Sequence, residues 1–192
     1  MPNIFFIHGS YGNPDENWFP WLRDRILDRG GSDWKIITPS FPTPQNQSLA
    51  SWRKVFVKYE TKITKDDIFI GHSLGPAFIL DVLQRIDISV KAVFLIAPFV
   101  SSLENQTFDS VNKTFYQEFE WERIRKHCRK FKVYYSDNDP YVAQERSREV
   151  AEKLGVKPIL VENAGHFNTA AGYTKFELLR KEIEKELTRI RK

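Results

Sequence analysis

Short apolar runs alternate with amphipathic stretches along the whole of this 192-residue chain. The short runs are rich in β-branched and aromatic residues, which is typical of strands that are buried on both faces. They are Asn3–His8, Lys35–Thr38, Asp67–Gly71, Lys91–Ala97, Lys132–Tyr135 and Pro158–Val161. A regular β–α alternation favours right-handed crossovers and a parallel sheet that is covered on both faces. The pattern therefore predicts an α/β fold with six parallel strands.

The stretches between these runs have helical periodicity, with apolar residues returning at intervals of three and four. The predicted helices lie near Trp18–Asp28, Leu49–Ile63, Leu74–Arg85, Glu118–Arg129, Tyr141–Leu154 and Thr174–Arg191. The last helix has one apolar face, which predicts packing on the sheet. That face consists of Phe176, Leu179, Ile183, Leu187 and Ile190. Residues 98–117 are polar without a clear period, and we interpret them as a surface excursion. Because no linker divides the chain, we expect one domain over residues 1–192.

The segment Gly71-His72-Ser73-Leu74-Gly75 has the G-x-S-x-G form of a nucleophile elbow. A predicted strand enters it and a predicted helix leaves it, which is the context that such an elbow requires. The sharp turn strains the backbone of the serine and needs small residues two positions away on either side, where Gly71 and Gly75 stand. Pro76 falls in the first helical turn, where its missing N–H costs no hydrogen bond. We therefore predict that Ser73 is a nucleophile rather than a structural serine.

A serine hydroxyl needs a base that removes its proton, and the chain has four histidines. The turn aims His72 away from Ser73, His8 ends the first predicted strand, and His127 lies in a basic helical stretch where we expect it to be solvated. His166 follows the last predicted strand. Since the carboxyl ends of parallel strands share one edge of a sheet, His166 and Ser73 are expected at the same edge. His166 is the predicted base.

The base in turn needs a carboxylate that fixes its tautomer and stabilises the imidazolium. Asp137 and Asp139 both follow the predicted strand Lys132–Tyr135. Asp139 is favoured because Pro140 presets the turn into the next helix, whereas Asp137 is the alternative and is also suited to capping the turn. The chain order Ser73, Asp139, His166 is the order of α/β-hydrolases.

Acyl transfer also requires N–H donors for the oxyanion of the tetrahedral intermediate. The predicted donors are the backbone N–H of Leu74 and that of Ser10, in the loop after the first strand, with Tyr11 as the alternative to Ser10. The aromatic residues available to shape an acyl pocket are Tyr11, Trp18, Phe19, Trp21, Phe99, Phe108 and Tyr116. Of these, Tyr11, Trp18 and Phe99 are predicted to line it. The alternative for each aromatic side chain is packing in the core.

Together these residues resemble the small α/β-hydrolases of the retinoblastoma-binding-protein-nine and YdeN-like serine hydrolase family. The resemblance covers essentially the whole chain and includes Asn17–Leu22, Phe115-Tyr116, Trp121–Ile124, Ser136–Val142 and Gly165–Asn168. It implies a compact hydrolase fold without a large lid, and Ser73, Asp139 and His166 as the triad. Two departures matter. Ser10-Tyr11 stand where some relatives have glycines, and no L-x-C-x-E sequence surrounds Cys128, so binding to a retinoblastoma-type protein is not expected.

Composition narrows the range of functions. A hydrophobic share of 41% and a charged share of 28% describe an ordinary globular protein, and a net charge of +4 spread along the chain does not indicate nucleic acid. The sequence has no apolar run of membrane-spanning length and a single cysteine, Cys128, so we expect a cytoplasmic protein. It has no zinc-type histidine spacing, no G-x-G-x-x-G and no Walker-type loop, so neither a metal nor a cofactor is expected.

These features predict a serine hydrolase that cleaves a carboxylic ester of a small or medium acyl group through an acyl-enzyme. Thioesters and amides are alternative substrates for the same chemistry. Two other functions stay open at this point. The first is a binding or scaffold protein whose hydrolase site is vestigial, and the second is an acyl transferase that uses the same triad.

Overall fold

The predicted strands form one parallel sheet in the computed structural model, which describes residues 1–30 and 33–188. Its strands are β1 (Asn3–Ile7), β2 (Lys35–Ile37), β3 (Ile68–His72), β4 (Ala92–Ile96), β5 (Phe131–Ser136) and β6 (Ile159–Val161). Their order across the sheet is β2-β1-β3-β4-β5-β6, and every neighbouring pair is parallel. The predicted α/β architecture with a parallel sheet is confirmed.

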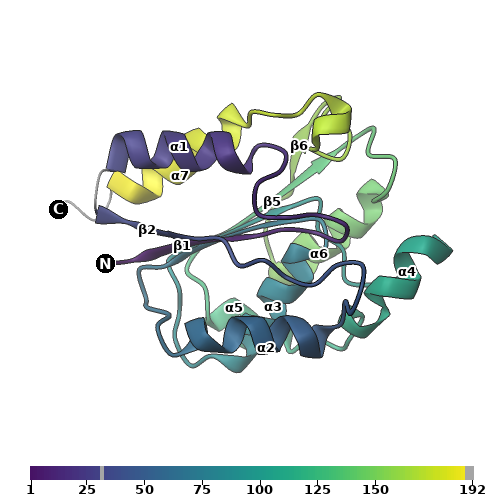
Figure 1. Cartoon of the computed structure of the whole chain (residues 1–192), viewed down its shortest axis with the longest axis horizontal. Helices are drawn as coiled ribbons and strands as arrows, with labels where there is room; N and C mark the ends of the chain where they lie inside the picture. The colour runs from purple at the N-terminus through teal and green to yellow at the C-terminus, as the bar shows by residue number, and fades with distance from the viewer. Residues whose placement is uncertain (31–32, 189–192) are drawn as a thin grey trace.

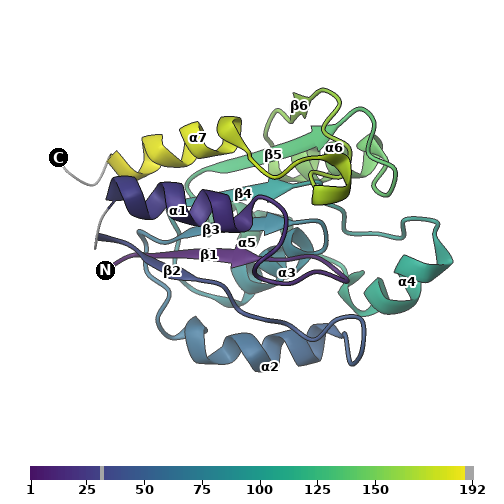
Figure 2. The same ribbon diagram turned by 45° about the horizontal axis from the view of Figure 1, so that its top comes forward.

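Helices cover both faces of this sheet (Figure 1). They are α1 (Phe19–Gly30), α2 (Leu49–Glu60), α3 (Gly75–Arg85), α5 (Trp121–Lys126), α6 (Gln144–Leu154) and α7 (Glu177–Thr188). The pair α1 and α7 lies on one face, and the turned view shows these two helices side by side (Figure 2). The helices α2, α3, α5 and α6 lie on the other face. Of the apolar face predicted for the last helix, Ile190 lies outside the described residues, as does the predicted helix end at Arg191.

The core has two layers, one on each face of the sheet. In β1, Phe5 and Ile7 join the layer under α2 and α3, whereas Ile4 and Phe6 join the layer under α1 and α7. Both faces of the strand are apolar because both are covered, which explains the continuous hydrophobic runs in the sequence. Burying each of these side chains contributes about 1.5–3 kcal/mol to the free energy of folding. This packing fixes the strand ends that position the site.

The excursion at residues 98–117 contains structure that the hydrophobic pattern does not predict. It forms the short helix α4 (Gln106–Asn112) and the 3-10 turn η2 (Lys113–Phe115), beyond the carboxyl ends of the strands (Figure 1). Asn105 caps α4 by accepting hydrogen bonds from the N–H groups of Thr107 and Phe108. The carboxylate of Asp109 accepts from the Tyr116 hydroxyl at 2.6 Å. Polar capping, and not apolar periodicity, therefore builds this segment, so the sequence pattern missed it.

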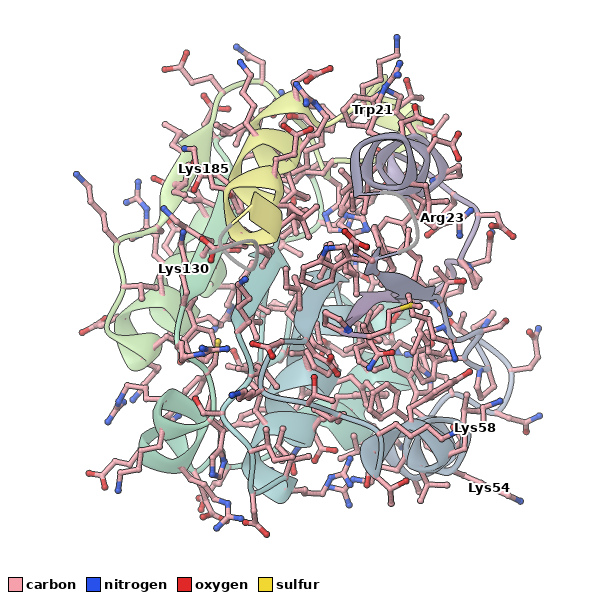
Figure 3. All side chains as sticks on the ribbon, turned by 90° about the vertical axis from the view of Figure 1, so that its left-hand side faces the viewer. Trp21, Arg23, Lys54, Lys58, Lys130 and Lys185 are labelled. Carbon is pink, nitrogen blue, oxygen red and sulfur yellow. The ribbon has the colours of Figure 1, made fainter. Side chains whose placement is uncertain are left out.

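Charged side chains lie at the end of the molecule opposite to α4 (Figure 3). Figure 3 shows Lys54 and Lys58 pointing outward from α2. On the other face, the Lys130 ammonium lies 2.5 Å from a carboxylate oxygen of Glu186, and this ion pair ties α7 to the start of β5. No helix in the described chain has the length and apolar character that crossing a membrane requires.

Candidate active site

Ser73 occupies a sharp turn between β3 and α3. Its φ is +60°, in the left-handed region that non-glycine residues rarely adopt. A Cβ on Gly71 would lie 2.6 Å from Cδ1 of Ile79, and one on Gly75 would clash with the carbonyl oxygen of Ile7. Only glycine fits at either position, because α3 starts directly against β1 and β3. The backbone strain and the glycine requirement are those predicted for a nucleophile elbow.

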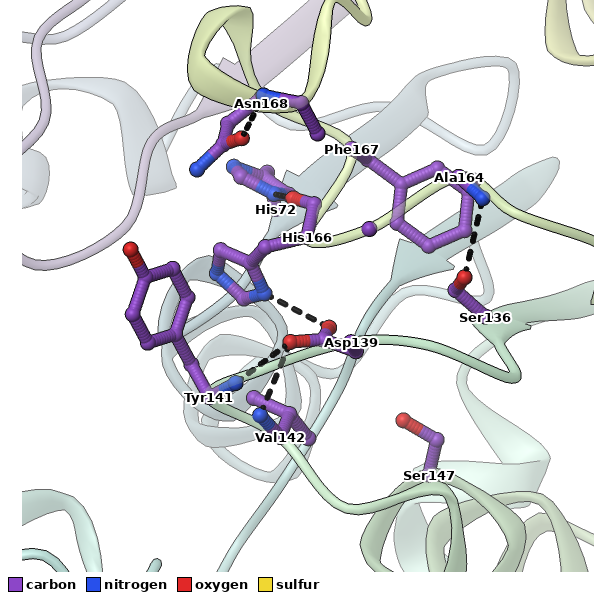
Figure 4. A network of polar contacts seen from close by, with 12 residues as sticks. His72, Ser136, Asp139, Tyr141, Val142, Ser147, Ala164, His166, Phe167 and Asn168 are labelled. Carbon is purple, nitrogen blue, oxygen red and sulfur yellow. Dashed lines mark hydrogen bonds and ion pairs between the residues drawn. The ribbon is translucent and has the colours of Figure 1, made fainter.

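His166 and Asp139 contact each other, as Figure 4 shows. His166 lines the same pocket as Ser73. The imidazole Nδ1–H donates a hydrogen bond of 2.7 Å to Oδ2 of Asp139. The other carboxylate oxygen accepts from the backbone N–H groups of Tyr141 (2.9 Å) and Val142 (3.0 Å), and only 3% of the Asp139 side chain is exposed. Because a carboxylate only accepts, this contact places the neutral ring's proton on Nδ1 and leaves Nε2 able to accept a proton.

The competing carboxylate, Asp137, has a different role. Three consecutive polar side chains, starting at the last residue of β5, accept hydrogen bonds from three consecutive N–H groups that lead into His166. The pairs are Ser136 with Ala164 (3.1 Å), Asp137 with Asn163 (2.8 Å) and Asn138 with Gly165 (2.8 Å). Asp137 is exposed and holds backbone, whereas Asp139 contacts the imidazole. The preference for Asp139 over Asp137 therefore agrees with the geometry.

His72 and His8 are buried and neutral. The Nε2–H of His72 donates to the carbonyl oxygen of His166 at 2.8 Å. Burial, together with the nearby His166 ring, lowers the pKa of His72 to about 3. In His8, Nδ1–H donates to the Gly9 carbonyl (2.8 Å), and Nε2 accepts from the Phe41 N–H (3.0 Å). Burial also lowers the pKa of His8. Both rings hold backbone around the site.

The prediction for the fourth histidine, His127, is wrong. His127 was expected to be solvated, but it is half-buried, and its Nδ1 lies 2.8 Å from the carbonyl oxygen of Leu83. The ring lies at the C-terminal end of α5 and contacts the last turn of α3. It lies in neither the Ser73 pocket nor its lining.

The first loop of the chain lies directly against Ser73. A Cβ on Gly9 would lie 2.7 Å from Cβ of Ser73. The Tyr11 N–H donates to the Thr43 hydroxyl at 2.6 Å and is therefore occupied. Within residues 1–30 and 33–188, neither the N–H of Ser10 nor that of Leu74 donates a hydrogen bond. Of the two loop donors considered for an oxyanion, the geometry therefore favours Ser10 over Tyr11.

The side chain of Ser10 is held on both sides. Its hydroxyl donates to Oδ1 of Asn112 at 2.5 Å and accepts from Nε2 of Gln47 at 2.9 Å. The same Gln47 nitrogen also contacts Oδ1 of Asn112 (2.8 Å) and the carbonyl oxygen of Val111 (3.1 Å). This Ser10–Gln47–Asn112 network joins the first loop to the segment before α2 and to the end of α4.

A pocket of about 390 Å³ opens over these groups, and both Ser73 and His166 line it. One wall is aromatic and consists of Tyr11, Phe108 and Tyr141. The ring centroids lie 5.8 Å apart for Tyr11 and Phe108, 5.4 Å for Phe108 and Tyr141, and 5.1 Å for Tyr141 and His166. Helix α4 supplies Phe108, so residues 98–117 form part of the pocket wall.

Two of the three aromatic residues predicted to line the pocket do not line it. Tyr11 does, with 47% of its surface exposed. Trp18 is wholly buried, and its indole N–H donates to the carbonyl oxygen of Phe167 at 3.0 Å. Phe99 is buried in the core, 6.3 Å from the ring of Tyr116. Trp18 belongs to the core layer under α1 and α7, and Phe99 belongs to the layer on the other face of the sheet, so both rings contribute to core packing.

The residue-by-residue prediction missed several pocket residues, among them Glu16, Tyr141 and Asn168. Tyr141 stands two residues after Asp139 in the same short turn, and this spacing is the one feature of the sequence from which its position near His166 can be inferred. Glu16 and Asn168 lie in polar loops without a motif. Among the described residues, no group of three or more His, Cys, Asp or Glu side chains is arranged to hold a metal ion.

Comparison with known proteins assigns the family. The family model described as serine hydrolase matches residues 4–185. The chain belongs to the serine hydrolase family. Within it, the putative hydrolase YdeN of Bacillus subtilis is 24% identical over 178 residues, which cover 92% of this chain and 91% of YdeN. Serine hydrolase RBBP9 of Rattus norvegicus is 24% identical over 171 residues, which cover 89% and 87% of the two chains.

The fold of this serine hydrolase is shared with a solved member. The crystal structure of the ydeN gene product from B. subtilis aligns with a TM-score of 0.89 at 22% identity, over 98% of this chain and 100% of that one. The resemblance seen in the sequence motifs is confirmed. The fold is that of a small α/β-hydrolase.

Proposed function

We propose that this serine hydrolase cleaves a carboxylic ester through an acyl-enzyme, with Ser73 as nucleophile, His166 as base and Asp139 as its partner. The observation that carries the proposal is the 2.7 Å hydrogen bond from Nδ1 of His166 to Asp139, beside a serine with φ +60° in the same pocket. A serine in a strained turn and a base with a fixed tautomer are the two parts that an activated hydroxyl needs.

The proposed reaction has two halves. Oγ of Ser73 attacks the acyl carbon while Nε2 of His166 takes the hydroxyl proton, and Asp139 stabilises the resulting imidazolium. The N–H groups of Leu74 and Ser10 stabilise the oxyanion. His166 then gives its proton to the departing alcohol, which leaves Ser73 acylated. In the second half, His166 takes a proton from water, the hydroxide formed attacks the acyl carbon, and Ser73 leaves with that proton as the acid is released.

The pocket supports a small or medium acyl substrate. Its volume of about 390 Å³ is at the lower end of the range for small-molecule sites, and its aromatic wall suits an apolar group. Thioesters and amides follow the same route with a different leaving group. Cys128 is buried and free, and a chain without an internal disulfide is consistent with the proposed cytoplasmic location.

Turnover of short p-nitrophenyl esters tests the proposal. Wild type is compared with Ser73→Ala and His166→Ala, and Ser110→Ala serves as the matched control because Ser110 is an exposed serine of α4. We expect loss of turnover in the first two variants and wild-type turnover in the control. Substrate turnover by folded Ser73→Ala at the wild-type rate would contradict the assignment. Product formed with added alcohols in preference to water would indicate acyl transfer instead.

A further inference from the structure

Glu16 places a carboxylate in the pocket that the proposed mechanism does not use. Among the residues that line the pocket in the described chain, it is the one acid, and neither lysine nor arginine is present. It lies directly against the first loop, since a Cβ on Gly12 would clash with Oε1 of Glu16. The N–H of Gly12 donates to the carbonyl oxygen of Gly9, which in turn lies against Ser73. The carboxylate therefore lies in the same loop, between β1 and α1, as the proposed oxyanion donor.

The positive charges near this carboxylate are few. In the described chain no lysine or arginine forms an ion pair with Glu16. Burial raises the pKa of the Glu16 carboxyl above its ordinary value, and a hydrogen bond from the Asn13 backbone and the nearby His166 oppose that rise. A partly buried carboxylate that no lysine or arginine pairs with is stabilised by a positive charge brought into the pocket.

The aromatic wall offers a second contact to such a charge. Tyr11, Phe108 and Tyr141 line the same pocket as Glu16 and form a continuous series of ring contacts that ends at His166. Aromatic faces attract ammonium groups through their quadrupole, most strongly where water is partly excluded. An anionic oxygen and several aromatic rings in one pocket are the chemistry that recognises an ammonium group rather than an anion.

We propose that the substrate of this site carries a cationic ammonium group, which the Glu16 carboxylate and the aromatic wall hold while Ser73 attacks the acyl carbon. This inference rests on the proposed function, since it names the class of ester that the site takes. It makes Glu16 a specificity-determining residue, with no part in the proton transfers. A neutral ester of the same shape lacks the contact with Glu16 and is a poorer substrate.

Matched ester pairs test the proposal kinetically. One pair, butyrylcholine and the neutral dimethylbutyl butyrate, carries the charge on the alcohol. The other, the p-nitrophenyl esters of trimethylammoniobutanoate and its neutral carbon isostere, carries it on the acyl group. In at least one pair we expect kcat/KM for the cationic ester to exceed that for the neutral ester by about 10-fold. The ratio should fall several-fold in Glu16→Gln, where only the aromatic wall still contacts the ammonium group.

Two further variants sharpen this test. Glu16→Lys should invert the preference, because it replaces the negative charge by a positive one. Asp24→Asn removes one negative charge from the exposed face of α1 and should keep the wild-type ratio. Ratios near one for wild type in both pairs, or a preference as large in Glu16→Gln as in wild type, would overturn the proposal.

Calorimetric titration with phenyltrimethylammonium separates failure of this inference from failure of the proposed hydrolase activity, because binding needs no turnover. If wild type hydrolyses neither pair, the titration alone decides. Saturable binding that weakens about 10-fold in Glu16→Gln but not in Asp24→Asn supports the ammonium site. No binding to wild type, or equal binding to both variants, overturns it. Circular dichroism of each variant establishes that the chain is folded.

Discussion

His72 donates a hydrogen bond of 2.8 Å from its Nε2–H to the carbonyl oxygen of His166. The residue immediately before the proposed nucleophile thus holds the backbone of the proposed base. The two rings lie 4.8 Å apart, and the first is neutral because burial lowers its pKa to about 3. This contact links the end of β3 to the loop after β6 and fixes the separation of Ser73 and His166.

Removing this link should affect the rate more than the binding of substrate. We expect His72→Ala to lower kcat by about 10- to 100-fold with KM nearly unchanged, because a base displaced by a fraction of an ångström no longer meets the hydroxyl. The cost in stability should be about 2 kcal/mol, since the substitution leaves the His166 carbonyl without its partner. His127→Ala is the control, because that histidine holds a helix end far from the pocket. Equal kcat values for the two variants would contradict the positioning role.

The same histidine predicts how stability depends on pH. His72 and His8 both have folded-state pKa values below those of the unfolded chain, so the unfolded chain binds more protons as the pH falls below about 6.5. Stability should therefore be fully present above that pH and decline below it, by up to roughly 1.4 kcal/mol per pH unit for each such group.

Urea unfolding at pH 7.5 and at pH 5.5 measures this dependence. His72→Gln should flatten the decline, because it removes the buried imidazole whose protonation favours the unfolded chain. The same slope in His72→Gln as in wild type would refute the assignment to His72.

The Ser10–Gln47–Asn112 network predicts a distant effect on the oxyanion donor. Asn112→Ala should lower kcat by about 10-fold, since the loop that presents the Ser10 N–H loses one of its two anchors. Ser10→Ala retains the N–H but loses both anchors, so the double variant with Asn112→Ala should be no worse than Ser10→Ala alone. The pH–rate profile should not move, because the His166–Asp139 pair is untouched. Additive losses, or a shifted profile, would contradict the positioning role.

The same substitution at Asp139 and at Asp137 distinguishes the roles of the two carboxylates. Asp139→Asn should lower kcat by about 10⁴-fold, because the amide no longer fixes the imidazole tautomer. Asp137→Asn should stay within a few-fold of wild type, as it weakens one backbone hydrogen bond at an exposed site. Steady-state kinetics of both variants with one ester decides the matter. The reverse order of losses would move the role to Asp137.

Features that depend on short sequence patterns could be predicted from the sequence. The elbow follows from two glycines at fixed spacing around Ser73, and the meeting of Ser73 with His166 follows from the shared edge of parallel strands. The pocket was harder to predict, because its wall depends on long-range packing. Helix α4 is built by the Asn105 cap and not by a periodic apolar face. The sequence pattern therefore named Phe108 only as one of several aromatic candidates for the pocket, and the structure places it in the wall. Trp18 was assigned to the pocket, yet its ring fits the core beneath α1.

Glu16 illustrates the same limit. An acidic residue in a polar loop normally faces solvent, and nothing in the neighbouring sequence distinguishes this one. It faces the pocket because the turn that begins at Gly9 folds back on itself. The fold is therefore largely a property of the hydrophobic pattern, whereas the selectivity of the site depends on loop geometry.

Fluorophosphonate labelling of wild type beside Ser73→Ala, read by intact mass, tests the central claim most directly. The reagent forms a bond only with a serine that a neighbouring base has activated. The account predicts a single adduct on wild type and none on the variant. Absence of any adduct on folded wild type, or an equal adduct on Ser73→Ala, would contradict an activated Ser73 and direct the search toward protein partners instead of substrates.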